Sequence, residues 1–396
     1  AARVPADAAG SGFNAVVIAT GIDQSHSVRA ADFDGDGDMD VVATDYVDGA
    51  VFWFRNDGTG TFVTQTLDAN LPGAYPVHVA DVDRDGDADV LAAGYLADTV
   101  AWYENDGSAG FTKHVVDSGI GADGAHSVVT GDMDGDGDLD LLTTNQDGNQ
   151  VAWYRNDGGE SFGSARVIDS YPLMLAKRAE FVDMDSDGDM DVVAGSFGEP
   201  PVPSGEVAWY ENDGSESFTK HVIINDAGFE GVYSVATADF DKDGDEDVVA
   251  VSQLDNKVAL FVNNGSEVFT TQIVDAAAIA ARTVRVADVD ADGWDDLLVA
   301  SVDDDTVAWH RNNQAGGFVK TAIDTGADGA YGVYAADMDQ DGDVDVLSAG
   351  RDSGEVKVYY QLGDPRPPGA DEVVLVEPGG LWHIRRPGLA DYTFYF

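Results

Sequence analysis

Short apolar runs separated by polar turns recur along the chain, and none of them shows the periodicity of an amphipathic helix. One unit contains a run at residues 77–80, a second at 90–93, an aromatic run at 100–103 and a run led by phenylalanine at 111–116. Runs of this length that are rich in valine, leucine and aromatic residues predict β-strands. The Asn105-Asp106-Gly107 segment predicts a reversal between the last two strands, because Asn and Gly tolerate positive φ.

The unit occurs seven times, and each copy carries an aspartate ladder, D-x-D-x-D-G-x-x-D, between its first and second apolar runs. Successive ladders are 49, 51, 51, 56, 49 and 49 residues apart, and they begin at Asp32, Asp81, Asp132, Asp183, Asp239, Asp288 and Asp337. Four short strands per unit and a period near 50 residues are typical of propeller blades. We therefore expect an all-β fold, a seven-bladed β-propeller.

The two ends of the chain predict how the ring closes. The seventh unit lacks its phenylalanine-led fourth strand, and residues 13–18 supply such a strand ahead of the first unit. This N-terminal strand is expected to complete the last blade, which leaves no open sheet edge in the ring. We therefore assign residues 1–361 to the propeller, with residues 1–10 as a mature or trimmed terminus.

Residues 362–396 lie outside the repeat and are expected to form a linker and a short β-rich extension. The linker is proline-rich at 365–368, and residues 373–376 and 381–384 are expected to pair as a hairpin across Pro378-Gly379-Gly380. The aromatic run at 392–396 suggests a truncated further module, with a strand docked on the propeller as the alternative.

The ladder has the chemistry of a calcium-binding loop. Carboxylates at positions 1, 3 and 5 can face one cation, the glycine at position 6 permits a sharp turn, and position 7 can offer its backbone carbonyl. An EF-hand loop would place Glu at position 12, but Ala43, Ala92 and Thr143 stand there, so position 9 must supply the fourth carboxylate. Zinc would favour His or Cys ligands instead. The expected ligands are Asp32, Asp34, Asp36, Asp38 and Asp40; Asp81, Asp83, Asp85, Asp87 and Asp89; Asp132, Asp134, Asp136, Asp138 and Asp140; Asp183, Asp185, Asp187, Asp189 and Asp191; Asp239, Asp241, Asp243, Asp245 and Asp247; Asp288, Asp290, Asp292, Trp294 and Asp296; and Asp337, Asp339, Asp341, Asp343 and Asp345.

The sixth ladder tests this assignment, because Trp294 occupies position 7, where the other six copies have Asp. If position 7 contributes only its carbonyl, the sixth site is intact and the neighbouring Asp295 does not ligate. About seven calcium ions are then expected in a structural role, since clustered carboxylates repel one another without a cation. The alternative is that the ladders are acidic turns without metal.

Composition and charge restrict the partners. The chain has 396 residues with 74 acidic and 21 basic side chains, which gives a formal charge of −53, and 44% of its residues are hydrophobic. Such a charge disfavours nucleic acid and anionic membrane surfaces. No apolar run approaches the ~20 residues of a membrane span, so membrane insertion is not expected. Acidic calcium sites suit a calcium-rich medium, which favours an extracellular, secreted or cell-surface location.

These ladders, the valine- or leucine-rich strand after them and the W-Y-x-N-D-G turn resemble the FG-GAP/VCBS repeat family, the integrin-α-like seven-bladed β-propellers. The resemblance covers about residues 13–361. It implies that the ladder joins the innermost strand of a blade to its second strand on the lower face, and that ligands meet the upper face. This scaffold carries adhesion proteins, lectins and some polysaccharide lyases, so the fold alone does not assign a function.

Carried over to this chain, the resemblance places the residue six before each ladder at the upper mouth of the central channel. Those residues, expected to bind ligand, are His26, Tyr75, His126, Lys177, Tyr233, Arg282 and Tyr331. Nearby upper loops add Tyr46, Tyr95, Gln146, Gln253 and Arg351, and the longest insertion, residues 196–205, is expected to influence specificity. The alternative is that the seven residues seal the channel. The recurrent Trp53, Trp102, Trp153, Trp209 and Trp309 are expected to pack between blades.

The sequence therefore favours a calcium-stabilised propeller that acts as a binding or adhesion module for a glycan or an extracellular protein ligand. We expect a monomeric propeller within a larger protein. One alternative is a polysaccharide-active enzyme, a lyase that uses His, Tyr and Arg at the upper mouth for β-elimination. Another is a structural spacer in a surface assembly.

Overall fold

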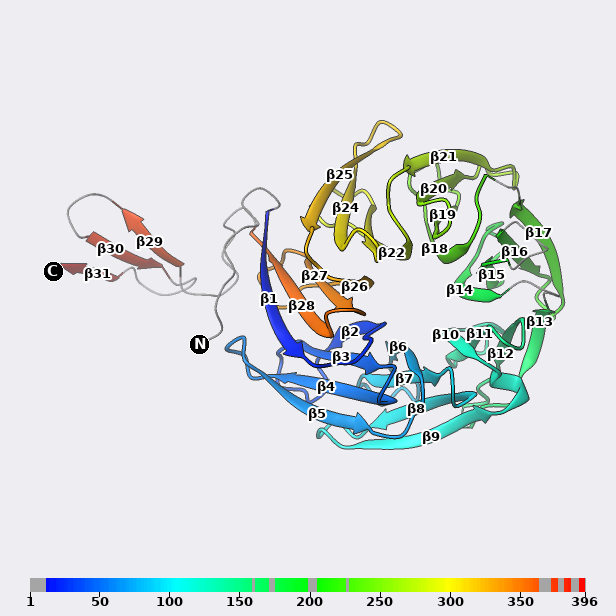
Figure 1. The fold of residues 1–396 in the computed structure, drawn as a ribbon, viewed down its shortest axis with the longest axis horizontal. Helices are drawn as coiled ribbons and strands as arrows, with labels where there is room; N and C mark the ends of the chain where they lie inside the picture. The colour runs from blue at the N-terminus through cyan, green and yellow to red at the C-terminus, as the bar shows by residue number, and fades with distance from the viewer. Residues whose placement is uncertain are drawn as a thin grey trace.

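The computed structural model describes residues 12–158, 161–170, 175–198, 205–225 and 228–362, together with strands at 372–376, 381–385 and 392–395. Seven four-stranded antiparallel sheets form a ring of blades around a central axis (Figure 1). The predicted all-β, seven-bladed propeller is thus confirmed. In the part of the chain that the structure describes, no helix has the length and apolar character needed to cross a membrane.

Each blade runs from an innermost strand at the axis to an outermost strand at the rim. The first three blades are β2 (Val28–Ala31), β3 (Asp40–Asp45), β4 (Ala50–Asn56) and β5 (Phe62–Asp68); β6 (Ala74–Ala80), β7 (Asp89–Gly94), β8 (Thr99–Asn105) and β9 (Phe111–Ser118); and β10 (Ala125–Gly131), β11 (Asp140–Asn145), β12 (Gln150–Tyr154) and β13 (Arg166–Ser170), with the 3-10 helix η1 (Ile120–Ala122) before β10. The next three are β14 (Ala176–Val182), β15 (Asp191–Ser196), β16 (Glu206–Asn212) and β17 (Phe218–Ile224); β18 (Val232–Ala238), β19 (Asp247–Ser252), β20 (Lys257–Val262) and β21 (Thr270–Asp275); and β22 (Ala281–Ala287), β23 (Asp296–Ser301), β24 (Thr306–Asn312) and β25 (Phe318–Asp324).

The seventh blade combines the two ends of the repeat region. Its strands are β26 (Ala330–Ala336), β27 (Asp345–Gly350), β28 (Glu355–Gln361) and, as the outermost strand, β1 (Phe13–Thr20). β1 pairs antiparallel with β28 from Phe13 opposite Gln361 to Thr20 opposite Glu355. The two strands lie side by side in Figure 1. This confirms the closure predicted from the missing fourth strand.

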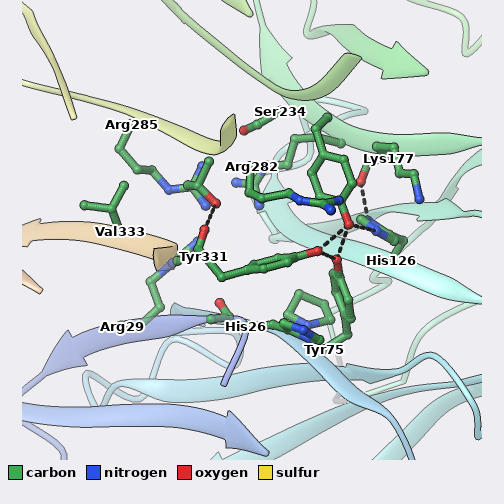
Figure 2. Close-up of a pocket in the computed structure, with 16 residues that line it drawn as sticks. His26, Arg29, Tyr75, His126, Lys177, Ser234, Arg282, Arg285, Tyr331 and Val333 are labelled. Atoms are coloured by element: carbon green, nitrogen blue, oxygen red, sulfur yellow. Dashed lines mark hydrogen bonds between the residues drawn. The ribbon is translucent and has the colours of Figure 1, made fainter. Parts of the chain in front are cut away.

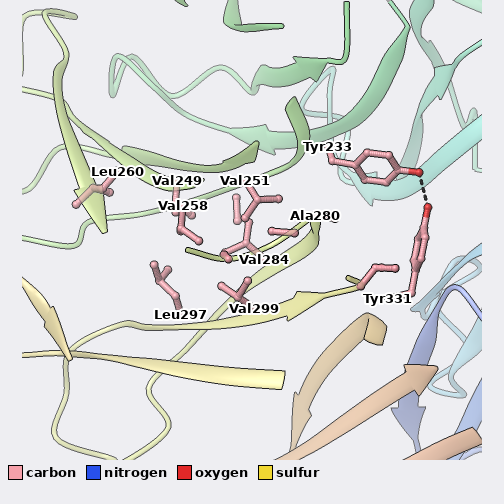
Figure 3. Packing of buried hydrophobic residues seen from close by; sticks show 14 of the residues in the cluster. Tyr233, Val249, Val251, Val258, Leu260, Ala280, Val284, Leu297, Val299 and Tyr331 are labelled. Carbon is pink, nitrogen blue, oxygen red and sulfur yellow. Dashed lines mark hydrogen bonds between the residues drawn. The ribbon is translucent and has the colours of Figure 1, made fainter. Parts of the chain in front are cut away.

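The core consists of seven apolar clusters, one at each interface between neighbouring blades. Figure 3 shows the cluster between blades five and six, where Val249 and Val251 of β19 face Val284 of β22 and Val299 of β23. Trp102, Trp153 and Trp209 are at most 1% exposed, which agrees with the expected packing between blades. β1 takes part as well, because Phe13 belongs to the cluster between blades six and seven. Each blade is therefore stabilised by both neighbours.

A β-bulge near the start of the innermost strand recurs in blades two to seven. The pairing of β10 with β11 passes from Ala125 to Ser127 and leaves His126 without a partner. Equivalent register shifts occur in β6, β14, β18, β22 and β26. A bulge redirects the side chain of its extra residue. In these six blades the residue six before the ladder falls at the bulge, which turns it toward the axis, whereas His26 of the first blade precedes β2.

The C-terminal strands β29 (Glu372–Val376), β30 (Leu381–Arg385) and β31 (Tyr392–Tyr395) form a three-stranded sheet. Val376 lies opposite Leu381 in the pairing of β29 with β30, as expected for the predicted hairpin. β31 pairs with β30. The proline-rich linker at 365–368 and residues 199–204 of the blade-four loop lie outside the described residues.

Candidate functional site

The aspartate ladders form the loops that join the first and second strands of every blade, at one end of the ring. The glycine at position 6 has a φ between 85° and 100° in all seven loops, a region that L side chains rarely adopt. In six of the loops its N–H donates to the position-1 carboxylate, for example Gly37 to Asp32 at 2.9 Å and Gly137 to Asp132 at 3.0 Å. The predicted sharp turn is therefore present, and it directs the ladder carboxylates toward one point.

The carboxylates at the centre of these loops suit a divalent cation. In the first three ladders the position-1, 3 and 5 side chains each offer an oxygen within 4.8 Å of the others, and in the fourth and fifth ladders positions 1, 3 and 9 do so. One oxygen each of Asp81, Asp132 and Asp183 is buried without a hydrogen-bond partner. Buried carboxylate oxygens without donors are costly unless a cation binds them. The donors are all oxygen, which fits a hard ion such as Ca²⁺.

The carboxylate at position 9 also accepts structural hydrogen bonds, a role that the sequence did not predict. In all seven blades it is at most 1% exposed. It accepts a hydrogen bond from the N–H of position 2 at 2.9–3.3 Å and another from a residue at the end of the third strand at 2.7–2.8 Å. Asp140, for example, joins the N–H groups of Met133 and Asn156. Burial nevertheless raises the pKa of Asp140 to about 7, since those bonds offset only part of its desolvation.

The sixth ladder keeps the loop geometry despite its tryptophan. The Trp294 N–H donates to Asp292 Oδ1 at 2.9 Å, and the Asp138 N–H of the third ladder makes the same bond to Asp136 at 2.9 Å. The Trp294 ring lies 5.4 Å from Lys242 Nζ, which belongs to the neighbouring ladder. Position 7 therefore adopts its backbone conformation independently of its side chain.

The seven residues expected at the channel mouth do come together, and the structure packs them into a plug. The hydroxyl groups of Tyr75, Tyr233 and Tyr331 meet at the axis, with a Tyr75–Tyr233 separation of 2.5 Å (Figure 2). His126 contacts the Tyr233 hydroxyl through Nε2 at 3.3 Å and the Lys177 carbonyl through Nδ1 at 2.8 Å. We call His26, Tyr75, His126, Lys177, Tyr233, Arg282 and Tyr331 the plug.

Burial and electrostatics limit what the plug can do. The cavity among these side chains is about 50 Å³, well below the ~300–1,000 Å³ of typical ligand pockets. Burial, with Arg351 and Arg282 nearby, lowers the pKa of His26 to about 3, and burial also keeps the pKa of His126 well below its usual value. Burial raises the pKa of Tyr75 and Tyr331 well above the ordinary range. At neutral pH these tyrosines are protonated, and histidines with lowered pKa values are weak bases, so the plug is poorly suited to abstract the proton that β-elimination removes.

A second ring of side chains surrounds the plug on the same face. It consists of the residues fourteen after the first ladder aspartate, here called the collar: Tyr46, Tyr95, Gln146, Phe197, Gln253, Val302 and Arg351. In six blades the collar N–H donates to a carbonyl just before the innermost strand, as Tyr95 does to Gly73 at 2.9 Å. The rings of Tyr46 and Tyr95 are 6.4 Å apart and each packs on Tyr75. Sequence reasoning identified five collar members, included Phe197 only as part of the insertion at 196–205, and missed Val302.

Polar groups adjoin the two collar tyrosines. The Tyr95 hydroxyl donates to Asp147 Oδ1 at 2.8 Å and accepts from Gln146 Nε2 at 2.9 Å. The Gln146 side-chain oxygen in turn accepts from Lys177 of the plug. Tyr46, Tyr95 and Gln146 are partly exposed, and Asp147 is exposed. The face therefore presents aromatic rings beside fixed hydrogen-bonding groups above a closed floor.

Three charged residues inside the channel escaped the sequence analysis. Arg29, Glu180 and Arg285 stand three residues before their ladders, where strand alternation from the bulge also directs side chains to the axis. Together with Arg178 they line the channel between the plug and the ladders. Charged residues in an otherwise apolar innermost strand are the signal that could have indicated them.

A model of the FG-GAP-like repeat matches residues 32–92, 81–143, 132–194, 183–250, 243–299 and 288–348. No curated protein sequence matches the chain. Among solved structures, the chain is similar to a lectin of Agrocybe aegerita that recognises non-reducing terminal N-acetylglucosamine, with 20% identity, a TM-score of 0.54, and coverage of 83% of this chain and 86% of the lectin. A putative 6-phosphogluconolactonase of Bacteroides uniformis is 13% identical with a TM-score of 0.55, over 85% of this chain and 92% of that protein. At these identities the likeness concerns the fold.

Proposed function

Because this chain belongs to the FG-GAP-like repeat family, we propose that it is an extracellular, calcium-stabilised propeller that binds a glycan on its collar face. The observation that carries the binding proposal is the pair of partly exposed tyrosines, Tyr46 and Tyr95, beside the polar side chains of Gln146 and Asp147. Sugars are recognised by aromatic faces that cover their apolar C–H surface and by polar groups that bind their hydroxyls.

The rigidity of the collar supports this proposal. Tyr46 and Tyr95 pack on Tyr75 of the plug, and the plug is closed by hydrogen bonds from several blades. Side chains that are already ordered lose little entropy when a ligand binds. The Agrocybe aegerita lectin, whose fold is similar to that of this chain, recognises non-reducing terminal N-acetylglucosamine, so the fold is compatible with glycan recognition.

Calcium would act at the opposite end of the ring. The carboxylates at positions 1, 3, 5 and 9 and the position-7 carbonyl would hold the ion, and the ion would offset their mutual repulsion. The ladders tie the first strand of each blade to the second, so a bound ion would stabilise the blade without taking part in ligand recognition. Dense acidic sites of this kind suit the calcium concentration outside cells.

A glycan array probed in calcium-containing buffer tests the binding proposal. We expect retention of a defined set of glycans and loss of that binding in Tyr95→Ala, which removes the ring and its link to Asp147. Tyr360→Ala is the matched control, because Tyr360 lies on β28 near the ladder end of its blade. Absence of any glycan binding, or equal loss in both variants, would overturn the proposal. Release of unsaturated products from uronate polysaccharides would show a lyase instead.

A further inference from the structure

A second cavity occupies the channel between the plug and the ladders. Its volume is about 250 Å³, and Arg29, Arg178, Glu180, Arg285 and Tyr334 are among the residues that line it. The three plug tyrosines do not belong to its lining, whereas all three arginines also line the small cavity among the plug side chains. Figure 2 shows Arg29 and Arg285 on innermost strands of different blades, β2 and β22.

The cavity carries an excess of positive charge. Three guanidinium groups line it, and Glu180 is the one carboxylate among the described residues of its lining. Glu180 Oε1 accepts hydrogen bonds from Arg178 Nε at 3.0 Å and Nη2 at 2.6 Å, and Arg285 lies 3.8 Å away. Arg29 donates to the Val28 carbonyl at 2.7 Å and lies 4.9 Å above the Tyr334 ring. The single carboxylate of Glu180 is therefore the only negative charge in the described lining for three guanidinium groups.

The excess positive charge destabilises the fold because the three arginines are largely buried. The arginine side chains are 5%, 13% and 15% exposed for Arg29, Arg178 and Arg285, so water screens them little. Burial and the neighbouring Arg178 lower the pKa of Arg29 to about 10, and the same two causes lower that of Arg285. Buried cations without enough counter-charge destabilise a fold. Of the 74 acidic residues in the chain, only Glu180 belongs to the described lining of this cavity.

We propose that this cavity binds a small dianionic oxyanion, a ligand that carries sulfate, phosphate or two carboxylates. A dianion would balance the two uncompensated positive charges. Guanidinium forks match the planar or tetrahedral oxygens of such groups with paired hydrogen bonds. The volume of about 250 Å³ restricts the occupant to a small molecule or one anionic substituent of a larger one. This site is separate from the collar, which lies beyond the plug.

Sulfate and succinate are suitable probes, tested on the whole chain in calcium-containing buffer. Isothermal titration calorimetry should show saturable binding of at least one of them to one site per chain. Thermal melts should rise more than in sodium chloride of equal ionic strength. Binding of sulfate alone would identify a tetrahedral oxyanion, and binding of succinate alone a dicarboxylate.

Two substitutions in the cavity should act in opposite directions. Arg29→Gln removes the cation that lacks a carboxylate partner and should weaken binding about tenfold or more. Glu180→Gln removes the competing carboxylate and should tighten binding, a result that unfolding cannot imitate. Arg166→Gln, on the exposed strand β13, is the matched control and should bind as the unmodified chain does.

The proposal fails if neither probe binds saturably to the unmodified chain. It also fails if Glu180→Gln leaves the affinity unchanged or weaker, because the carboxylate would then not compete with the ligand. A general salt effect would stabilise the Arg29→Gln and Arg166→Gln variants equally and without saturation, and that result too would overturn it.

Discussion

Replacement of Asp140 by alanine distinguishes the two tasks of the position-9 carboxylate. The side chain is fully buried and accepts the N–H of Met133 at 2.9 Å and the N–H of Asn156 at 2.7 Å. Alanine leaves both buried N–H groups without an acceptor. Each such loss costs about 1–3 kcal/mol, so we expect the free energy of unfolding to fall by about 2–6 kcal/mol. This is a large share of the ~5–15 kcal/mol that stabilises a typical domain.

The assay is urea unfolding followed by tryptophan fluorescence, once with millimolar calcium and once with EDTA. Asp140→Ala should be destabilised in both buffers, because its hydrogen bonds do not depend on a metal. Asp132→Asn is the control: it keeps an oxygen that can accept the Gly137 N–H but loses a ligand charge, so it should be destabilised mainly with calcium. If Asp140→Ala matches the unmodified chain in EDTA, position 9 acts through metal alone and the reasoning is wrong.

Four further predictions concern the ladders and the closure. EDTA should lower the melting temperature, since a Kd of about 10–100 μM at about 1 mM calcium gives about 1.5–3 kcal/mol per site, and a melt unchanged by EDTA would contradict a bound ion. The pKa of Asp140 is raised to about 7 in the folded chain, against ~3.9 in the unfolded chain, so the folded calcium-free chain binds more protons between these two pH values. The free energy of unfolding of the calcium-free chain should therefore fall as pH rises from about 4 to about 7. The stabilisation by calcium should be larger at pH 7.5 than at pH 5. Trp294→Ala should leave the calcium stoichiometry unchanged by metal analysis, because position 7 contributes its backbone, whereas loss of one ion would refute that role. Phe13→Ala should lower the free energy of unfolding in urea by about 3–5 kcal/mol, since this 2%-exposed ring packs between the last two blades. If Phe13→Ala is less destabilising than Val63→Ala, on exposed β5, closure of the ring by β1 is contradicted.

The opposite faces of the ring would separate the stabilising ladders from the proposed ligand-binding face. The ladders lie where the innermost strand ends, and the plug and collar lie where it begins, so each blade spans both faces with one strand. A change at a ladder can weaken the blade without touching Tyr95 of the collar. Calcium removal should therefore reduce glycan binding only as far as it unfolds the blades.

The sequence alone determined the repeat, the strand content, the ring closure and the ladder positions. These features depend on local patterns: a glycine with positive φ at position 6, an Asn-Asp-Gly reversal, and a phenylalanine-led strand displaced to the N-terminus. Patterns among residues close in sequence can be recognised from the sequence itself, and their recurrence in seven units strengthens the prediction.

Only the tertiary structure decided what the inward-facing residues do. Sequence placed Tyr75, Tyr233 and Tyr331 at one mouth, but their hydroxyl groups meet only because bulges in three different blades aim them at the same point. The excess charge around Arg29 likewise arises from blades far apart in the chain, with a single carboxylate at Glu180. Such contacts depend on how the seven blades are arranged around the axis, so the sequence of a single repeat does not determine them.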